Sequence, residues 1–478
     1  MKIEAMTEKY ERWLGDESRI RGRADAVCFP GSFEEACEAV DHARRSGLRV
    51  TPQGARTGLT GGAVPEGGLI VDCQGLKGLE LREGPALYAE AGVTLEQLHA
   101  FLRKEPWVFP PNPTEESAAL GGLFGCNAMG IDGQKTAPWV RKLWWLTAAG
   151  AVWEISRGSY IFDDSGCALP EGGRLSCETF ESSGVLGGLV AVRQMDLIDF
   201  LAGSEGQLGM ALAFELELAK KPDCAWGVLY FLSTDQAAMA LCRAVAQTEN
   251  SGSVTVMEYY DRAALSLLSA GRQSAAALQE LPEFPQGACA AVYIELAGDD
   301  PDVLEGALFE QLDIFEGLGG SEEQTWAASE RYEIDRLRKL RHVAPELANG
   351  KIDSLSQAVP GLTRLSSDLK GPAEKAGEYL EMYRGGIAQR GVHAVIYGTA
   401  AQNRFHVNFL PETLEERAEC EALMAEWAAR AAADSGQIVT ENGAGLLKRE
   451  LALRFVPEAV KRQIKTVKEA LDPEGVFK

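Results

Sequence analysis

Two glycine-rich runs constrain this chain more than any other feature. The first, Pro52–Gly62, lies between two strand-like stretches, Leu48–Thr51 and Leu69–Asp72, and the second spans Gly121–Gly130. Glycine lets a backbone approach a ligand closely and adopt positive φ angles. Consecutive free N–H groups in such turns bind anions. The two runs together therefore predict one large phosphate-bearing cofactor that is held by backbone groups.

The spacing of the glycines excludes two common nucleotide-binding loops. A Rossmann loop needs G-x-G-x-x-G between a strand and a helix, whereas Gly54 and Gly58 are four positions apart. A Walker A loop needs G-x-x-x-x-G-K-[ST], and Gly133–Thr136 lacks both the spacing and the upstream glycine. Glycine turns without a ligand remain an alternative, which explains one run better than two.

Composition narrows the classes of partner. With 47 basic and 70 acidic residues the formal charge is −23, which argues against nucleic acid or an anionic membrane as the main partner. We expect no signal peptide and no transmembrane segment, because no apolar run has the required length. The ten cysteines include no Cys-x-x-Cys pair. This spacing excludes an iron–sulfur or zinc-ribbon site and favours a cytoplasmic protein with reduced thiols.

Strand-like and helix-like segments alternate along the chain. Ser32–Glu35 and Thr94–Gln97 have the form of capping boxes and predict helices that run to Ser46, before Gly47, and to about Lys104. Residues 158–193 are rich in Gly, Ser and Cys, and we interpret them as irregular surface structure that could act as a lid. A strand at 211–218 closes this first region.

From Cys224 onward glycine is rarer and strands alternate with long helices. We expect strands at 227–232, 289–296 and 394–398, and helices at 236–248, 302–318, 372–391 and 413–435, with a final helix near 457–471. This alternation predicts an α+β fold whose antiparallel sheet carries helices on one face. We place the domains at 1–220, 221–430 and 431–478, the last being a C-terminal segment that returns to the first domain.

An ordered series of motifs resembles the FAD-linked oxidases and dehydrogenases of the vanillyl-alcohol oxidase (PCMH-type) superfamily. Within it the chain is most similar to the branch of D-lactate, glycolate and D-2-hydroxyglutarate dehydrogenases. The matching segments, which follow the family order along nearly the whole chain, are Pro52–Pro65, Pro110–Thr114, Gly121–Gly130, Gly203–Gly209 and Leu471–Phe477.

The resemblance implies a PCMH-type FAD-binding domain with two α+β subdomains, an α+β cap domain and a tail that returns to the FAD site. We expect FAD to be held without a covalent bond, because none of the five histidines lies in the first loop. Arg56, which replaces a usual glycine, is expected to give FAD phosphate or a partner a cationic contact. The implied FAD-binding residues are Pro52, Gly54, Ala55, Arg56, Thr57, Gly58, Leu59, Pro113, Thr114, Gly121, Gly122, Asn127, Ala128, Gly130, Glu205, Gly209 and Asn442.

The motifs that carry substrate chemistry in this branch are altered here. Where the branch has two metal-binding histidines, this chain has Thr399 and His406, and where it has Glu-His-Gly it has Glu441, Asn442 and Gly443. An asparagine amide cannot accept a proton near neutral pH, and a zinc site takes three or four protein ligands. We therefore expect no catalytic metal.

The remaining candidate catalytic residues are His406, Arg341, Glu441 and Asn442. His406 is either the remaining acid–base group or a hydrogen-bonded strand histidine, and Glu441 is either catalytic or orients the tail. Arg341 matches the carboxylate-binding arginine of the branch, with Arg338 at the usual tryptophan position; the alternative is a solvated helix charge. Asp368 and Pro372 resemble the Asp-x-x-x-Pro motif that follows, and Ser366 stands at a usual lysine position.

Two functions follow from these residues. The first is an FAD-dependent oxidoreductase that moves hydride from a small organic hydroxy acid or related alcohol to the flavin. Its electrons would pass to an external acceptor, namely an iron–sulfur protein, an electron-transfer flavoprotein or a quinone. The second is a flavoprotein subunit of a larger electron-transfer complex whose substrate site is lost or repurposed; a scaffold without flavin is a weaker third. Both homo- and hetero-oligomers are compatible with the sequence.

Overall fold

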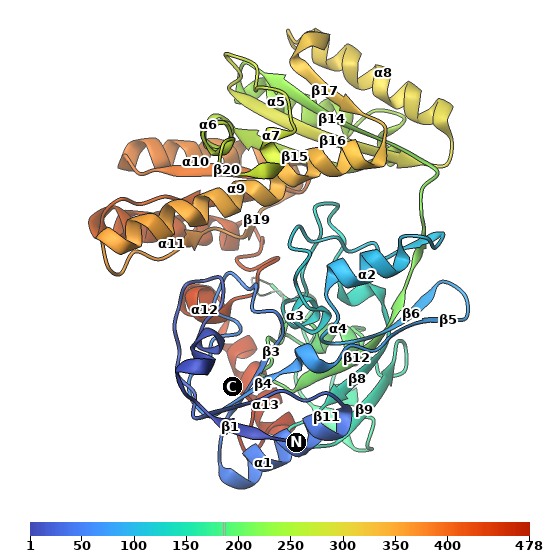
Figure 1. Cartoon of the computed structure of the whole chain (residues 1–478), viewed down its shortest axis with the longest axis vertical. Helices are drawn as coiled ribbons and strands as arrows, with labels where there is room; N and C mark the ends of the chain where they lie inside the picture. Colours follow the sequence, from blue (N-terminus) through green and yellow to red (C-terminus); the bar gives the residue numbers. More distant parts are fainter. Residues whose placement is uncertain (185, 187) are drawn as a thin grey trace. The chain divides into compact units, whose positions relative to one another are not determined.

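The computed structural model describes residues 1–184, 186 and 188–478, which divide into two compact units (Figure 1). Unit 1 consists of Met1–Gly130, Gln134–Lys221 and Val439–Lys478, and unit 2 consists of Ile131–Gly133 and Pro222–Ile438. Unit 1 is therefore discontinuous in sequence, because the C-terminal segment returns to it after the chain has built unit 2.

Unit 1 contains two main sheets. The first has the order β1-β2-β4-β3, with β3 and β4 parallel, and the second has the antiparallel order β5-β6-β12-β8-β9. The strands of the first sheet are β1 Ile3–Ala5, β2 Ala26–Cys28, β3 Val50–Gln53 and β4 Leu69–Asp72. Those of the second are β5 Leu79–Arg82, β6 Ala86–Glu90, β8 Val140–Leu146, β9 Val152–Ser156 and β12 Met210–Glu217. Two short pairs join β7 Trp107–Val108 to β13 Ala219–Lys220 and β10 Gly166–Ala168 to β11 Arg174–Ser176.

The two main sheets of unit 1 and their helices form the two expected α+β subdomains, and the core of the first sheet also includes Leu146, Met210 and Leu212 from the second. The helices are α1 Phe33–Ser46, α2 Leu95–Leu102, α3 Leu120–Cys126, α4 Leu197–Leu201, α12 Gly445–Arg454 and α13 Glu458–Leu471. Helix α1 begins after Ser32, whose hydroxyl accepts from Glu35 N, and ends at Gly47 with φ 64°. Helix α2 begins with the predicted capping box of Thr94 and Gln97. Side-chain caps satisfy the free N–H groups of a first turn.

The C-terminal segment completes the first sheet of unit 1. Val50 N of β3 donates to Val476 O at 2.6 Å, and Lys478 N donates back to Val50 O at 3.2 Å. Val476 and Phe477 are buried in the core beneath α1. The predicted return of the tail to the first domain thus takes the form of an additional extended segment beside β3.

Unit 2 is built on one antiparallel sheet, which in the described chain has the order β17-β14-β16-β15-β20-β21-β18, with β19 also paired to β21. Its strands are β14 Cys224–Leu232, β15 Val254–Asp261, β16 Ala290–Gly298, β17 Thr325–Ala328, β18 Leu365–Ser366, β19 Leu369–Lys370, β20 Ala394–Thr399 and β21 Arg404–Phe409. Its helices are α5 Asp235–Val245, α6 Arg262–Gly271, α7 Ala276–Gln279, α8 Pro301–Gly317, α9 Arg331–Ala358, α10 Ala376–Arg390 and α11 Leu414–Ala433.

The α+β class and the antiparallel sheet of unit 2 agree with the prediction, but its helices cover both faces of the sheet rather than one. Tyr260 of β15 packs with α6 and α9 in one core. Its neighbour Tyr259 points to the opposite face, where its hydroxyl meets Asp235 of α5. Successive strand residues alternate between faces, and the apolar residues of both faces are buried, so each face requires a cover.

Residues 158–193, of which 185 and 187 lie outside the described residues, contain more regular structure than expected. The segment contains the β10–β11 hairpin, and Phe162, Cys167 and Leu175 belong to the core of the second sheet. Helix α3, which was not predicted, forms from the second glycine run. Within the described residues, no helix has both the length and the apolar composition that crossing a membrane requires.

Candidate active site

The first glycine run forms an open loop between β3 and β4. Among the described residues, none of the N–H groups of residues 55–62 donates to a protein acceptor, although Ala63 N bonds to Asp16. Backbone N–H groups that are partly buried need partners, and a row of them suits the oxygens of a pyrophosphate. The loop that holds Gly54, Ala55, Thr57, Gly58 and Leu59 therefore fits a phosphate-bearing cofactor.

The second glycine run meets this loop. A Cβ added to Gly54 would lie 3.0 Å from Ala119 Cβ and 3.7 Å from Gly122 N. Gly122 and Gly125 face open space, because an added Cβ would have no neighbour within 4 Å. Helix α3 thus presents bare backbone beside the first loop, as close approach of a ligand requires. Pro113 and Thr114 precede this helix in a segment without regular structure.

The end of α3 is fixed by Asn127, which has φ 51° and accepts a hydrogen bond from Ala137 N at 3.0 Å. Ala128 is buried, and Gly130 N donates to Gln134 O at 2.9 Å. These contacts give Asn127, Ala128 and Gly130 a role in shaping the loop after α3.

Glu205 ties three segments of unit 1 together. Its backbone N–H donates to Gly125 O at 2.8 Å, and its carboxylate accepts from Ala444 N at 2.6 Å and Gly445 N at 2.8 Å. A carboxylate at the start of α12 is also favoured by the helix dipole. Glu205 therefore anchors the tail beside the second glycine run.

Three further predicted residues have clear structural partners. Gly209 lies against β8, where an added Cβ would approach Trp145 Nε1 to 2.5 Å. Pro52 packs on Gly206, where an added Cβ would be 2.8 Å from Pro52 Cγ. The carbonyl of Asn442 accepts from Thr60 Oγ1 at 2.9 Å, so the tail turn also contacts the first loop.

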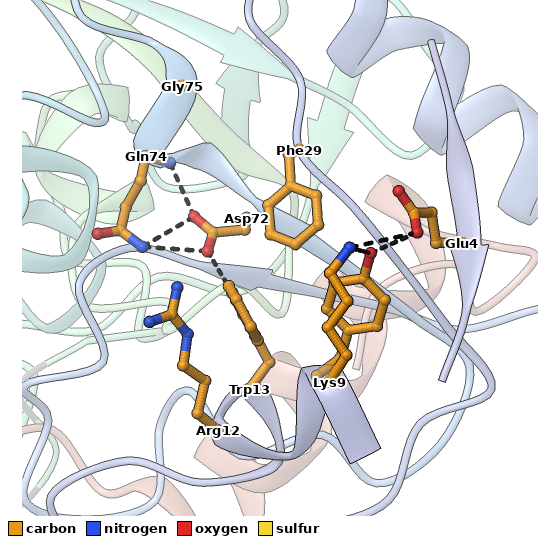
Figure 2. A pocket seen from close by; sticks show the side chains of 9 residues that line it. Glu4, Lys9, Arg12, Trp13, Phe29, Asp72, Gln74 and Gly75 are labelled. Carbon is orange, nitrogen blue, oxygen red and sulfur yellow. Dashed lines mark hydrogen bonds and ion pairs between the residues drawn. The ribbon is translucent and has the colours of Figure 1, made fainter. Parts of the chain in front are cut away.

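Arg56 is engaged within the protein. Its Nη1 lies 3.0 Å from Asp72 Oδ2, and its guanidinium lies 5.2 Å from the centre of a Trp13 ring. Asp72 also accepts hydrogen bonds from Trp13 Nε1 and from Gln74 (Figure 2). In the structure, the charge of Arg56 is therefore paired with the buried carboxylate of Asp72. A contact between Arg56 and a ligand stays a prediction. Asp72 and Trp13 also line a groove of about 480 Å³ with Glu4, Lys9, Tyr10, Arg12, Phe29, Gln74 and Gly75.

In unit 2, Arg341 lies on the buried face of α9 rather than in solvent. Its side chain is 11% exposed, and its Nε lies 3.2 Å from Glu258 Oε2 on β15. The guanidinium carbon lies 4.7 Å from the centre of the Tyr397 ring on β20. These contacts exclude the alternative of a solvated helix charge.

His406 lies on β21 directly opposite Tyr397, and the two rings are 5.8 Å apart. A ring nitrogen of His406 and a carboxylate oxygen of Asp368 lie within 4.8 Å of each other. Arg341 and His406 thus flank the same tyrosine, so two predicted catalytic residues share one face of the sheet. Burial raises the pKa of Tyr397, which keeps its phenol neutral.

Sequence reasoning missed the partners of these residues, above all Glu258, Tyr397 and Arg404. The signal available was the alternation of polar and apolar residues in Arg404–Phe409, which places Arg404, His406 and Asn408 on one face. Glu441 and Asn442 belong to unit 1, where the structure places them in the turn before α12. Their predicted action together with His406 and Arg341 stays a prediction.

Comparisons with known proteins agree with these features. A family model described as FAD binding domain matches residues 24–156, and one described as FAD linked oxidases, C-terminal domain, matches residues 224–478. The chain belongs to the FAD-linked oxidases. As the family requires, it is an oxidoreductase with FAD as its cofactor, and the bare backbone of the two glycine runs fits that group.

This FAD-linked oxidase is 23% identical to mitochondrial D-2-hydroxyglutarate dehydrogenase of Danio rerio, over 97% of this chain and 79% of the relative. It is 32% identical to D-lactate dehydrogenase of Archaeoglobus fulgidus over 148 residues, which cover 30% of this chain and 33% of the relative. Among solved structures, alkyldihydroxyacetonephosphate synthase superimposes with a TM-score of 0.63 at 13% identity, over 96% of this chain and 76% of that one. This likeness shows the same fold.

Proposed function

We propose that this FAD-linked oxidase oxidises a small 2-hydroxy acid whose carboxylate binds to Arg341. The observation that carries the proposal is the placement of Arg341, which the fold buries on α9 over the ring of Tyr397, the residue that also contacts His406. A buried arginine is well suited to hold a carboxylate through two parallel hydrogen bonds. The relatives named D-2-hydroxyglutarate and D-lactate dehydrogenase support a substrate of this class.

His406 is the proposed proton acceptor. The hydroxyl of a 2-hydroxy acid is one carbon from its carboxylate, so a substrate on Arg341 would present its hydroxyl close to the anchoring cation. Asp368, within 4.8 Å of a ring nitrogen of His406, can hold the imidazole in the orientation that leaves the other nitrogen to accept a proton. When bound, FAD supplies the acceptor for the hydride.

No metal step is part of the proposal, because Arg341 would supply the positive charge that a metal would otherwise bring to the carboxylate. Thr399, which stands at the position of the first expected metal ligand, donates its hydroxyl hydrogen to Glu258. His406 and Asp368 are nevertheless side chains that metals bind, so metal content belongs in the test.

We propose a diffusible or protein electron acceptor, namely an iron–sulfur protein, an electron-transfer flavoprotein or a quinone. The described residues contain ten cysteines without a disulfide, which supports a reducing compartment, and we propose the cytoplasm. Fractionation of cells that express the protein tests this location.

A second candidate is a flavoprotein subunit of an electron-transfer complex. The observation in its favour is Asn442, which stands at the position of the expected base and whose carbonyl accepts a hydrogen bond from Thr60. In such a subunit FAD would relay electrons from a partner protein, and no hydroxy acid would reduce it.

Anaerobic mixing of the purified holoenzyme with D-lactate, D-2-hydroxyglutarate and glycolate separates the two functions. We expect bleaching of the flavin by at least one acid, without dependence on metal in samples that are analysed for metals and treated with a chelator. Arg341→Ala should raise KM by roughly a hundredfold or more, since hydrogen bonds to a charged group contribute about 1.5–3 kcal/mol each and the proposal has two of them. Absence of bleaching with a panel of 2-hydroxy acids, together with reduction by a co-purifying protein, would favour the second function.

A further inference from the structure

The side chain of Arg341 forms an ion pair with Glu258. Glu258 lies on β15 with its side chain 1% exposed, and its Oε2 faces Arg341 Nε at 3.2 Å. A carboxylate this deeply buried needs hydrogen bonds or ion pairs for both oxygens. Arg341 accounts for one oxygen, and the other contacts a neighbouring strand.

Thr399 supplies the partner for the second oxygen. Its hydroxyl donates to Glu258 Oε1 at 2.7 Å and accepts from Arg404 Nη2 at 2.8 Å. The register aligns the three residues across three strands, because Glu258 pairs with Thr399 and Thr399 pairs with Arg404. An arginine can only donate, so the threonine hydrogen is directed toward Glu258.

Hydrogen bonds also hold the Tyr397 ring, which lies against Arg341. Asn408 Nδ2 donates to the hydroxyl of Tyr397 at 2.8 Å, and Arg364 Nη2 donates to Asn408 Oδ1 at 3.0 Å. The second nitrogen of Arg364 donates to Asn349 on α9 at 2.8 Å. This connection links the helix that carries Arg341 to the strands that support its guanidinium group.

Helix α9 also contains a proline close to Arg341. Pro345 lies inside the helix, four residues after Arg341. Proline has no backbone N–H, so residue 345 cannot donate a helical hydrogen bond to the preceding turn. Helix α9 nevertheless continues through this position, from Arg331 to Ala358.

We propose that Thr399 and Glu258 are positioning residues that set the direction of the Arg341 guanidinium for the carboxylate of the substrate; this inference rests on the proposed function. At the position where the related branch has a metal-binding histidine, this chain uses a hydroxyl to orient the arginine that binds the carboxylate. Substrate anchoring thereby depends on a hydrogen-bonded chain across β21, β20 and β15.

The test uses variants that keep every charge. Thr399→Val removes the hydroxyl at nearly constant volume, Thr399→Ser retains it, and Glu258→Asp withdraws the carboxylate by one methylene. The matched control is Glu295→Asp, because Glu295 is also buried on the same sheet face and pairs with Arg338, one turn before Arg341. Holoenzyme of each variant is compared for KM and kcat with the best 2-hydroxy acid, and for Kd with oxalate by calorimetry.

We expect Thr399→Val and Glu258→Asp to raise KM and the oxalate Kd about five- to tenfold, since one hydrogen bond contributes about 1 kcal/mol. The change in kcat should stay below about twofold, and Thr399→Ser should restore binding. Glu295→Asp should bind oxalate as the wild type does, even if its melting temperature falls. A purely structural role would lower the melting temperature of Thr399→Val and Glu258→Asp without moving KM or the oxalate Kd.

The outcomes separate this inference from the proposed function. If Arg341→Ala binds oxalate as tightly as wild type, or if wild type binds none of the tested acids, the carboxylate site itself is wrong. If Arg341→Ala loses binding while Thr399→Val and Glu258→Asp retain it, the proposed function stands and the positioning role is overturned.

Discussion

Several buried polar side chains of unit 2 are paired with an oppositely charged side chain or a backbone N–H group. Arg341 meets Glu258, Arg338 makes a two-pronged contact with Glu295, and Asp261 caps α6 by accepting from Ala264 N at 2.7 Å. A buried polar group that loses its partner costs more than the pair contributes when intact. Substitutions of single members should therefore have large effects, and their sign depends on which charge is left without a partner.

Asp261 gives unit 2 a pH-dependent stability. Burial raises the pKa of Asp261 from an ordinary value of 3.8 to about 7, so the folded state binds its proton more tightly than the unfolded chain does. This contribution to stability is fully present below about pH 4 and is lost as pH rises through 7. Asp261→Asn keeps the cap and does not titrate. We expect its free energy of unfolding, relative to wild type, to increase from pH 5 to pH 8 in urea titrations.

The control for that measurement is Asp300→Asn, which replaces the exposed cap of α8. A pH dependence equal to that of Asp261→Asn would show that burial of Asp261 is not its cause.

Residue-level prediction from the sequence was limited by distance along the chain. His406 and Arg341 were identified through their motifs, and both lie beside Tyr397. Glu258 was not, because it is 141 residues from Thr399 and only the register of β15 and β20 brings the two together. Local spacing carries no information about such pairs, whereas alternation within a strand would have assigned Thr399 and Tyr397 to one face.

At the scale of elements, capping signals placed α1 and α2, and periodicity placed α5, α8, α10, α11 and α13 to within a few residues. Helices that contain glycine or proline in their interior were harder to predict. The bounds of α1 follow from Ser32 and Gly47, as predicted. Helix α9 was anticipated only around Arg341, because Pro345 and Gly350 argue locally against a helix that extends from Arg331 to Ala358. Packing of Ile334, Leu337 and other apolar residues against the sheet outweighs that local preference.

Helix α3 contains glycines at positions where alanine would favour the helix more strongly. Gly122→Ala should raise the free energy of unfolding of the FAD-free protein by up to about 1 kcal/mol, because the added Cβ meets no protein atom within 4 Å. The same methyl group should weaken FAD binding if α3 contacts the cofactor. Thermal unfolding of the apoprotein and fluorescence titration with FAD measure the two effects.

Gly385→Ala in α10 is the matched control, since its Cβ also meets open space and it lies in unit 2. It should give the helical gain without changing FAD affinity. Unchanged FAD affinity in Gly122→Ala would remove α3 from the cofactor site.

At the scale of the molecule, unit 1 depends on residues from both ends of the chain. Phe477 is 1% exposed and packs under α1, so Phe477→Ala should lower the free energy of unfolding of unit 1 by about 3–5 kcal/mol. FAD should be released at a lower temperature, and release into the supernatant after denaturation would agree with non-covalent binding. The control Phe309→Ala, 58% exposed on α8, should change stability by less than about 0.5 kcal/mol. Equal effects of the two variants would contradict this account of the tail.

The pairing of Val50 with Val476 also has a consequence for synthesis. Strand β3 leaves the ribosome long before Val476–Lys478 exist, so during most of translation the edge of the first sheet has no neighbour on that side. Unit 2, including residues 131–133, is complete when Ile438 has emerged. A ribosome stalled at that point should therefore carry a nascent chain in which unit 2 resists protease while unit 1 is still cleaved.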